Sequence, residues 1–119
     1  MANPFGYLEL HSTDASRAKR FYSELFGWKT KDIPAPKIGT YTEVGTEEGP
    51  PAGLMAQQEP GARSTWLAYV TVPKLDETVV RAQKLGATVV VPRTEIPEGA
   101  FAVLEDPTGA RIGVFQKAS

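Results

Sequence analysis

The sequence predicts an α+β fold in which one strand–helix motif is used twice. The segment Tyr-Leu-Glu-Leu at 7–10 is followed by an amphipathic stretch that ends at Gly27. The segment Trp-Leu-Ala-Tyr at 66–69, fifty-nine residues later, is followed by a second amphipathic stretch that ends at Gly86. Because the interval from the aromatic residue to the glycine is 20 residues in both halves, equivalent positions of the two halves can be compared.

The first half opens with a strand and a helix. Residues 5–11 alternate in character and are rich in strand formers, so they are predicted to form a strand. The Ser-Thr-Asp sequence at 12–14 supplies N-cap side chains, and Gly27 suits a left-handed C-terminal cap. Between these caps, apolar residues recur at helical spacing. They are Ala18, Phe21, Tyr22, Leu25 and Phe26.

The rest of the chain completes the motif and then repeats it. In the first half, strands are predicted at 28–33, 39–45 and 52–57, and 59–64 is a linker. The second half is predicted to contain a strand at 65–72, a helix at 75–85, and strands at 88–91, 101–104 and 111–116, the last two joined by a hairpin turn at 106–109. We therefore expect one domain, residues 1–119, made of βαβββ repeats 1–58 and 65–119. These repeats would form curved, cup-like mixed sheets with the helices outside.

Composition argues against several classes of function. The 13 Lys and Arg residues nearly balance the 14 Asp and Glu residues and are scattered along the chain, so no basic stripe for nucleic acid is expected. No apolar run is long enough to span a bilayer, and the N-terminus does not resemble a secretory leader. Cysteine is absent, which excludes disulfides and thiolate chemistry. We expect a cytoplasmic protein.

Two segments resemble one known superfamily. They are 14–28, Asp-Ala-Ser-Arg-Ala-Lys-Arg-Phe-Tyr-Ser-Glu-Leu-Phe-Gly-Trp, and 101–110, Phe-Ala-Val-Leu-Glu-Asp-Pro-Thr-Gly-Ala. Both are similar to hallmarks of the glyoxalase / bleomycin-resistance / extradiol-dioxygenase superfamily, also called vicinal oxygen chelate. Within it, the chain most resembles a metal-poor, glyoxalase-like branch. Members of the superfamily isomerise substrates, open rings, modify antibiotics or only bind them, so the fold by itself does not specify the function.

The resemblance also implies where a metal would be held. It places one ligand on the first strand and one on the last strand of each repeat. Here these positions are Tyr7, Leu54, Trp66 and Gly113. None supplies the His, Glu, Asp or Cys lone pairs that zinc, nickel or iron requires, and a one-residue slip to Gly53 or Met55 changes nothing. His11 is the only histidine, so we expect no family-type metal and no cofactor.

Strand parity predicts which side chains line a pocket. Leu8 and Leu10 suit packing under the helix, which leaves Tyr7, Glu9 and His11 on the concave face. By the same argument, Trp66, Ala68 and Val70 would face the cup, with Leu67 and Tyr69 under the second helix. The predicted ligand-binding set is Tyr7, Glu9, His11, Met55, Trp66, Ala68, Arg111, Gly113 and Phe115. An aromatic wall with a few polar groups is typical of small-molecule pockets.

Several of these residues have two interpretations. Glu9 is the candidate catalytic residue, because a desolvated carboxyl group can act as a general base, but it could instead form a salt bridge with Arg111 or another cation. His11 could move protons near neutral pH, or it could be exposed or cap the helix. Trp28 is expected to pack between helix and sheet, and Asp106 to form a turn.

Three functions remain open from the sequence. The first is a metal-free protein that binds or sequesters a small molecule in the aromatic-lined cup. The second is a glyoxalase-like lyase or isomerase, or a dioxygenase-related enzyme, that uses Glu9 as acid or base. The third is a structural partner protein without a ligand. The resemblance further implies that such short chains pair as homodimers.

Overall fold

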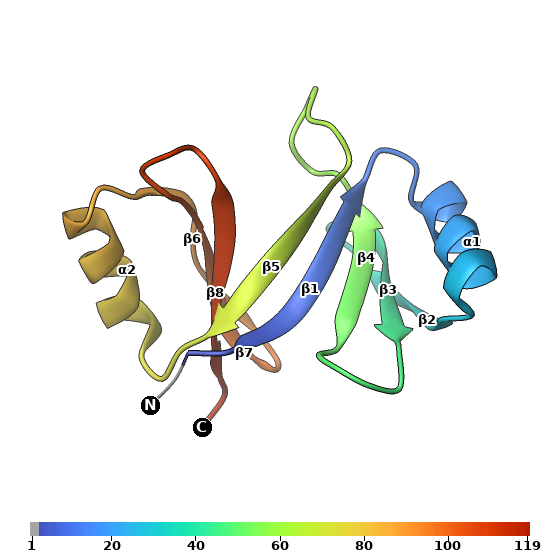
Figure 1. The fold of residues 1–119 in the computed structure, drawn as a ribbon, viewed down its shortest axis with the longest axis horizontal. Coiled ribbons are helices and arrows are strands. Elements are labelled where there is room, and N and C mark those ends of the chain that lie inside the picture. Colours follow the sequence, from blue (N-terminus) through green and yellow to red (C-terminus); the bar gives the residue numbers. More distant parts are fainter. Residues whose placement is uncertain (1–2) are drawn as a thin grey trace. The chain divides into compact units, whose positions relative to one another are not determined.

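The computed structural model describes residues 3–119 and contains eight strands and two helices in the predicted order, which confirms the α+β class with two βαβββ motifs (Figure 1). The chain divides into two compact units. The first unit comprises residues 7–67. The second unit comprises residues 3–6 and 68–119. Neither helix among residues 3–119 is long and apolar enough to cross a membrane.

In the first unit, a mixed sheet carries one helix. Its elements are β1 (Phe5–Ser12), α1 (Ala15–Phe26), β2 (Lys29–Ala35), β3 (Gly39–Gly45) and β4 (Ala52–Ala56). The strand order is β2-β3-β4-β1, and only the β4–β1 pair is parallel. Asp14 caps α1 by accepting a hydrogen bond from the backbone N–H of Arg17 at 3.1 Å, and Gly27 ends the helix with φ of 70°.

The second unit repeats this arrangement with β5 (Thr65–Thr71), α2 (Leu75–Lys84), β6 (Thr88–Ile96), β7 (Gly99–Glu105) and β8 (Arg111–Lys117). The strand order is β5-β8-β7-β6, again with one parallel pair, β5–β8. Asp106 forms the predicted turn between β7 and β8. Its side chain accepts hydrogen bonds from Thr108 and from the backbone N–H of Ala110, and these bonds lower the pKa of that carboxyl.

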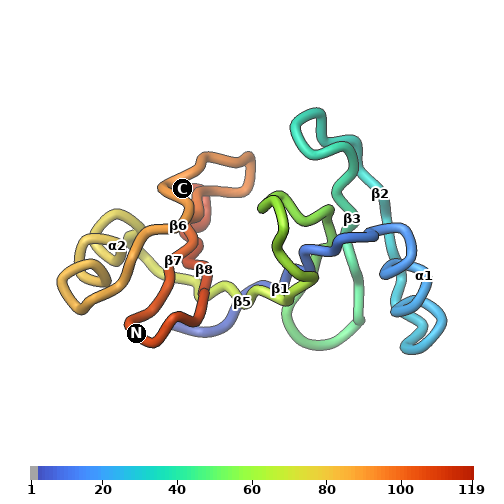
Figure 2. Tube along the Cα trace, turned by 90° about the horizontal axis from the view of Figure 1, so that it is seen from above, coloured from blue at the N-terminus to red at the C-terminus, as the bar shows by residue number. Residues whose placement is uncertain are grey.

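Each helix packs on one face of its own sheet (Figure 2). In the first unit, residues of β1, β3 and β4 form the core with α1 and Trp28, as expected for Trp28. The buried members are Leu10, Val44, Ala52 and Leu54. In the second unit, Leu75 of α2 is fully buried. It packs with Val72, Ala100, Ala102, Leu104 and Val114.

Two strands extend past the positions at which they were predicted to end, and in both the next residue is a proline. β2 continues through Pro34 and β6 continues through Pro92. Each lies at the end of its unit's strand order, where a missing backbone N–H costs least. The register of β6 against β7 also shifts between Val89 and Val91 and between Val91 and Thr94. Such irregularities accommodate a proline within a strand.

The two repeats are related by an offset of 60 residues over most of the motif, and the predicted 59 is wrong there. Glu9 pairs with Gly53 across the parallel strands of the first unit, and Tyr69 pairs with Gly113 in the second. The helices begin at Ala15 and Leu75, which gives the same offset. The offset falls to 59 at the closing glycines and at the first residues of β2 and β6, because α2 is two residues shorter than α1 and one additional residue, Leu85, precedes its glycine.

This one-residue error inverted the predicted faces of β5. Val70 packs against the core under α2, and alternation places Ala68 on the same face. Tyr69 lies on the opposite face, where its ring meets Phe101 at 6.0 Å. Trp66 does not share a face with Tyr7 either, because it packs against Tyr22 and Trp28 on the helix side of the first unit.

Candidate functional site

A chain of hydrogen-bonded polar side chains lies on the face of the first unit away from α1. Tyr7, Glu9 and His11 alternate along β1 with the core residues Leu8 and Leu10, so the predicted face of β1 is correct. His11 Nε2 lies 2.7 Å from one carboxylate oxygen of Glu9. The side chains of His11 and Glu9 are only 20% and 12% exposed, so this pair is largely withdrawn from water.

Tyr41 completes the network and is not among the site residues predicted from the sequence. Its hydroxyl donates to the second carboxylate oxygen of Glu9 at 2.7 Å and is hydrogen-bonded to the hydroxyl of Tyr7. Tyr41 lies on β3 beside Thr42, which is buried on the helix side. In the sequence, Tyr41 and Glu43 alternate with Thr42 and Val44 along the predicted strand 39–45. If Val44 had been assigned to the core, this alternation would have placed Tyr41 on the site face.

Gly53 of β4 allows Tyr41 to reach Glu9. The strand β4 lies between β3 and β1, and Gly53 is paired with Glu43 on one side and with Glu9 on the other. A Cβ atom at position 53 would overlap the hydroxyl groups of both Tyr41 and Tyr7. The missing side chain therefore lets the tyrosine rings lie across β4 and meet the carboxylate.

The network keeps Tyr41 in its neutral, hydrogen-donating form. Burial raises the pKa of the Tyr41 hydroxyl above its ordinary value, and the negative charge of Glu9 and the hydrogen bond with Tyr7 raise that pKa further. A neutral phenol and an imidazole thus flank the two oxygens of one carboxylate. This arrangement fixes the direction of the Glu9 carboxylate and can accept or donate hydrogen bonds to a polar ligand.

Other predicted site residues are distributed between the two units. Met55 of β4 is paired with His11 and shares the face of Gly53. In the second unit, Gly113 and Phe115 alternate with Ile112 and Val114, which pack toward α2, so they lie on the predicted face. Arg111 Nε lies 3.7 Å from a carboxylate oxygen of Glu105.

The predicted capping role of His11 is wrong, because Asp14 caps α1.

The residues present do not fit a metal ion of the kind the superfamily implies. With the corrected offset of 60, the partners of Tyr7 and Gly113 are Leu67 and Gly53, which also lack donor side chains. Within residues 3–119, no group of three or more His, Cys, Asp or Glu side chains is placed to hold a metal. Glu9 and His11 are the nearest approach to such a set, and they are hydrogen-bonded to each other.

A hollow of about 460 Å³ adjoins one end of the network. Tyr7 belongs to both features, whereas Glu9 and His11 do not line the hollow. The two exposed cations at its edge, Lys29 and Lys31, come from β2, and Lys31 is paired with Glu43 of β3. Glu43 also lines the hollow, and the remaining lining residues are Thr30, Val44, Gly45, Pro51 and Ala52. Its size is within the range of small-ligand sites, although the hollow is open to solvent.

Comparison with known proteins identifies the family. The model of the glyoxalase-like domain matches residues 7–115. The chain belongs to the glyoxalase-like domain family. This family is part of the vicinal oxygen chelate superfamily, so the resemblance inferred from the two sequence segments is confirmed.

Two relatives of this glyoxalase-like domain are longer proteins. The putative glyoxylase CFP32 of Mycobacterium bovis is 34% identical over 115 residues, which are 92% of this chain and 44% of the relative. The anthracycline biosynthesis protein DauV of a Streptomyces species is 25% identical over 126 residues, which cover 93% of this chain and 46% of the relative. The domain thus spans less than half the length of these curated relatives.

Solved structures support the fold of the domain. The methylmalonyl-CoA epimerase from Mycobacterium tuberculosis aligns with a TM-score of 0.72 and 14% sequence identity, over 97% of this chain and 88% of the epimerase. A methylmalonyl-CoA epimerase from Streptomyces coelicolor aligns with a TM-score of 0.71 and 11% identity over the full length of both chains. At this level of identity, the likeness establishes the fold only.

Proposed function

We propose that this glyoxalase-like domain binds a small polar molecule on the site face of the first unit, without a family-type metal. The observation that carries the proposal is the Tyr7–Tyr41–Glu9–His11 network, defined as those four side chains and the hydrogen bonds that join them. A half-buried set of fixed donors and acceptors, on the face of the first unit away from α1, is suited to orienting a ligand. Family membership supports a small-molecule site of this kind.

The adjoining hollow suggests the chemical class of the ligand. Lys29 and Lys31 place two positive charges at its rim, beside the single carboxylate of Glu43, and Tyr7 connects the hollow to Glu9 through Tyr41. A compound with an anionic group beside the lysines and a carbonyl or hydroxyl group near the tyrosines would satisfy both ends. Small carboxylic acids that carry a second polar group belong to this class.

The test is binding of methylmalonate and salicylate, each titrated into ¹⁵N-labelled protein and followed by amide chemical shifts. We expect shifts at residues of β1, β3 and β4 with at least one of the two probes. The Tyr41→Phe variant should weaken that binding about tenfold, because it removes the donor to Glu9. Glu98→Gln, in an exposed turn of the second unit, is the matched control and should bind as the unmodified protein does. Shifts confined to other regions, or no shifts with either probe, would refute the proposal.

The metal-free part of the proposal has its own measurement. Elemental analysis of protein purified without chelator should find far less than one zinc, nickel, manganese or iron atom per chain. One tightly bound equivalent would overturn this part, because the donor set described above offers only Glu9 and His11 at the network.

A second candidate function is acid–base catalysis by Glu9. The observation that favours it is the position of the Glu9 carboxylate between two groups that carry exchangeable protons, the Tyr41 hydroxyl and the His11 imidazole. In such a step, the carboxylate would take a proton from a carbon next to a carbonyl group, the electron pair would move to the carbonyl oxygen, and a solvent-derived proton would return to the carbon.

Deuterium exchange distinguishes this second candidate from binding alone. Methylmalonyl-CoA, the compound named for the structurally similar epimerases, would be incubated with the protein in D₂O and analysed by mass spectrometry. Exchange at the carbon that is lost in Glu9→Gln, but retained in Glu98→Gln, would support catalysis. Binding without exchange would leave the first proposal in place and refute the second for this compound.

A further inference from the structure

The protons of the Tyr7–Tyr41–Glu9–His11 network all point toward the Glu9 carboxylate. Tyr41 donates its hydroxyl proton to one oxygen of Glu9 at 2.7 Å, so the Tyr41 oxygen can only accept in its bond with Tyr7. Burial raises the pKa of the Tyr41 hydroxyl, which keeps this proton in place. The other oxygen of Glu9 lies 2.7 Å from His11 Nε2, and a carboxylate only accepts hydrogen bonds. Nε2 of His11 therefore carries a proton.

This arrangement fixes the tautomer of His11, the single histidine of the chain. In a neutral imidazole, one ring nitrogen carries a proton and the other carries a lone pair. Because Nε2 donates to Glu9, Nδ1 carries the lone pair. Glu9 is the one hydrogen-bond partner of the His11 side chain within residues 3–119, and Met55, which is paired with His11 on β4, has no donor in its side chain. Since the His11 side chain is 20% exposed, a ligand can reach this acceptor.

The second repeat indicates that the fold does not require the network. With the offset of 60, the equivalent of His11 is Thr71, and the equivalent of Tyr41 is Phe101, which has no hydroxyl group. The second unit nevertheless forms the same strands and helix. Polar groups that are withdrawn from water cost desolvation free energy. A half-buried polar network that the fold does not need therefore indicates a role in binding.

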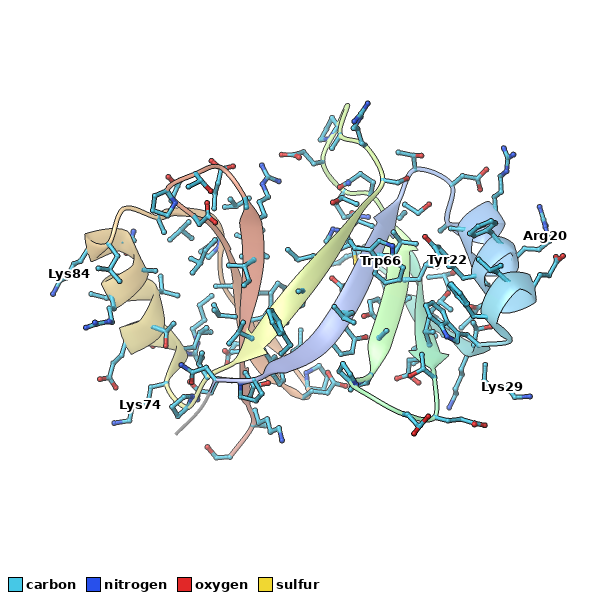
Figure 3. The ribbon with its side chains drawn as sticks, in the orientation of Figure 1. Arg20, Tyr22, Lys29, Trp66, Lys74 and Lys84 are labelled. Carbon is cyan, nitrogen blue, oxygen red and sulfur yellow. The ribbon has the colours of Figure 1, made fainter. Side chains whose placement is uncertain are left out.

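The lysine rim of the hollow lies at some distance from His11. Tyr7, which lines the hollow, precedes His11 by four residues on β1, and four strand residues span about 13 Å. Figure 3 shows Lys29 at the lower end of the first unit, whereas β1 runs upward and ends at the upper end. Lys29 and Lys31 carry two positive charges there against the one carboxylate of Glu43, which favours an anionic group. A molecule that reaches both the rim and His11 is therefore extended.

From these observations we infer that the ligand is an extended organic acid whose carboxylate lies at the lysine rim and whose far end donates a hydrogen bond, as a hydroxyl group does, to His11 Nδ1. A ketone, an ether or a second carboxylate brings only acceptors to this end and would leave the lone pair of Nδ1 unpaired. Glu9 is here a positioning residue, because it fixes the imidazole through Nε2. The inference rests on the proposed function and adds the end group and the length of the ligand.

The tautomer of His11 is the first test, because the protein has one histidine. Long-range ¹H–¹⁵N spectra of the labelled full chain at about pH 8, where an ordinary imidazole is neutral, distinguish a protonated ring nitrogen from an unprotonated one. We expect Nε2 to be protonated and Nδ1 to be unprotonated. Glu9→Gln, which introduces a group that donates as well as accepts, should mix the two tautomers. A proton on Nδ1 of the unmodified protein would overturn the inference and leave the proposed function in place.

Two matched probes test the class of ligand. The compounds p-hydroxyphenylpropanoate and p-methoxyphenylpropanoate have similar length and the same carboxylate, but only the first has a donor at its far end. We expect the hydroxy acid to bind about tenfold more tightly and to be the one that shifts the Nδ1 signal. His11→Leu should abolish this preference. His11→Asn, whose side-chain oxygen takes the place of Nδ1, should retain part of it, and Glu98→Gln should retain all of it.

The outcomes separate the inference from the proposed function. Equal affinities for the two probes, or no binding of the hydroxy acid while methylmalonate or salicylate still binds, would overturn the inference alone. A preference that survives in His11→Leu would overturn it as well, because the donor would then be recognised elsewhere. No shifts at β1, β3 and β4 with any of these compounds would refute the proposed function, and the inference would fall with it. Far-ultraviolet circular dichroism and urea unfolding confirm that each variant is folded.

Discussion

Gly53→Ala is expected to disrupt the Tyr7–Tyr41–Glu9–His11 network by displacing the side chain of Tyr41. The added methyl group would overlap the hydroxyls of Tyr41 and Tyr7, so the Tyr41 ring must move and its hydrogen bond to Glu9 is lost. Overpacking of this kind costs about 1–3 kcal/mol. Gly53 does not have a positive φ, so alanine returns about 0.5–1 kcal/mol of backbone entropy. We expect the free energy of unfolding to fall by about 1–2 kcal/mol.

A double-mutant cycle with Tyr41→Phe shows whether the loss arises in the network. Tyr41→Phe alone removes the hydrogen bonds to Glu9 and Tyr7 and should cost about 1–2 kcal/mol, because one of them reaches a charged group. Once these bonds are absent, the aromatic ring can move away from the new methyl group. Gly53→Ala should therefore cost about 1 kcal/mol less in this background than in the unmodified protein.

The assay is urea unfolding followed both by tryptophan fluorescence, since Trp28 and Trp66 lie in the first unit, and by far-ultraviolet circular dichroism, which reports both units. Gly113→Ala is the matched comparison, because the added methyl group there would overlap the base of the Tyr69 ring. Tyr69 is only 6% exposed and has less room to move, so Gly113→Ala should cost more, about 3 kcal/mol. Effects of Gly53→Ala and Tyr41→Phe that add to within about 0.5 kcal/mol would refute the reasoning.

Two further measurements address titration and helix capping. The pKa of Tyr41 is raised from 10.0 by burial, so above pH 10 the unfolded chain loses this proton while the folded chain keeps it. Stability should therefore be complete below pH 10 and fall above it by up to about 1.4 kcal/mol per pH unit, and urea unfolding should show a smaller alkaline fall in Tyr41→Phe. Lys74 occupies the N-cap of α2 without a side-chain cap bond, and its pairing with Glu77 is highly exposed. Lys74→Asp should raise the free energy of unfolding by about 0.5–1 kcal/mol, and an unchanged urea midpoint would contradict this.

Local patterns in the sequence determined the elements and one face of the site. Alternation along β1 separated Leu8 and Leu10 from Tyr7, Glu9 and His11, because a strand places successive side chains on opposite faces. The cap at Asp14 and the turn at Asp106 were also predictable, since each depends on hydrogen bonds within a few residues. The superfamily was predicted from the similarity of two short segments, 14–28 and 101–110, to known members.

Only the tertiary structure decided which residues complete the site and which face each strand presents. The β1–β4 pairing joins residues more than forty positions apart, and the space above Gly53 that admits Tyr41 exists only once β3, β4 and β1 lie side by side. The 59-residue spacing was fixed by the closing glycines, while the strands follow 60, and one residue is enough to reverse a strand's faces. Helical periodicity predicted which positions of α1 are apolar. How deeply each of these side chains is buried depends on how much of the sheet lies beneath the helix, and only the tertiary structure shows this.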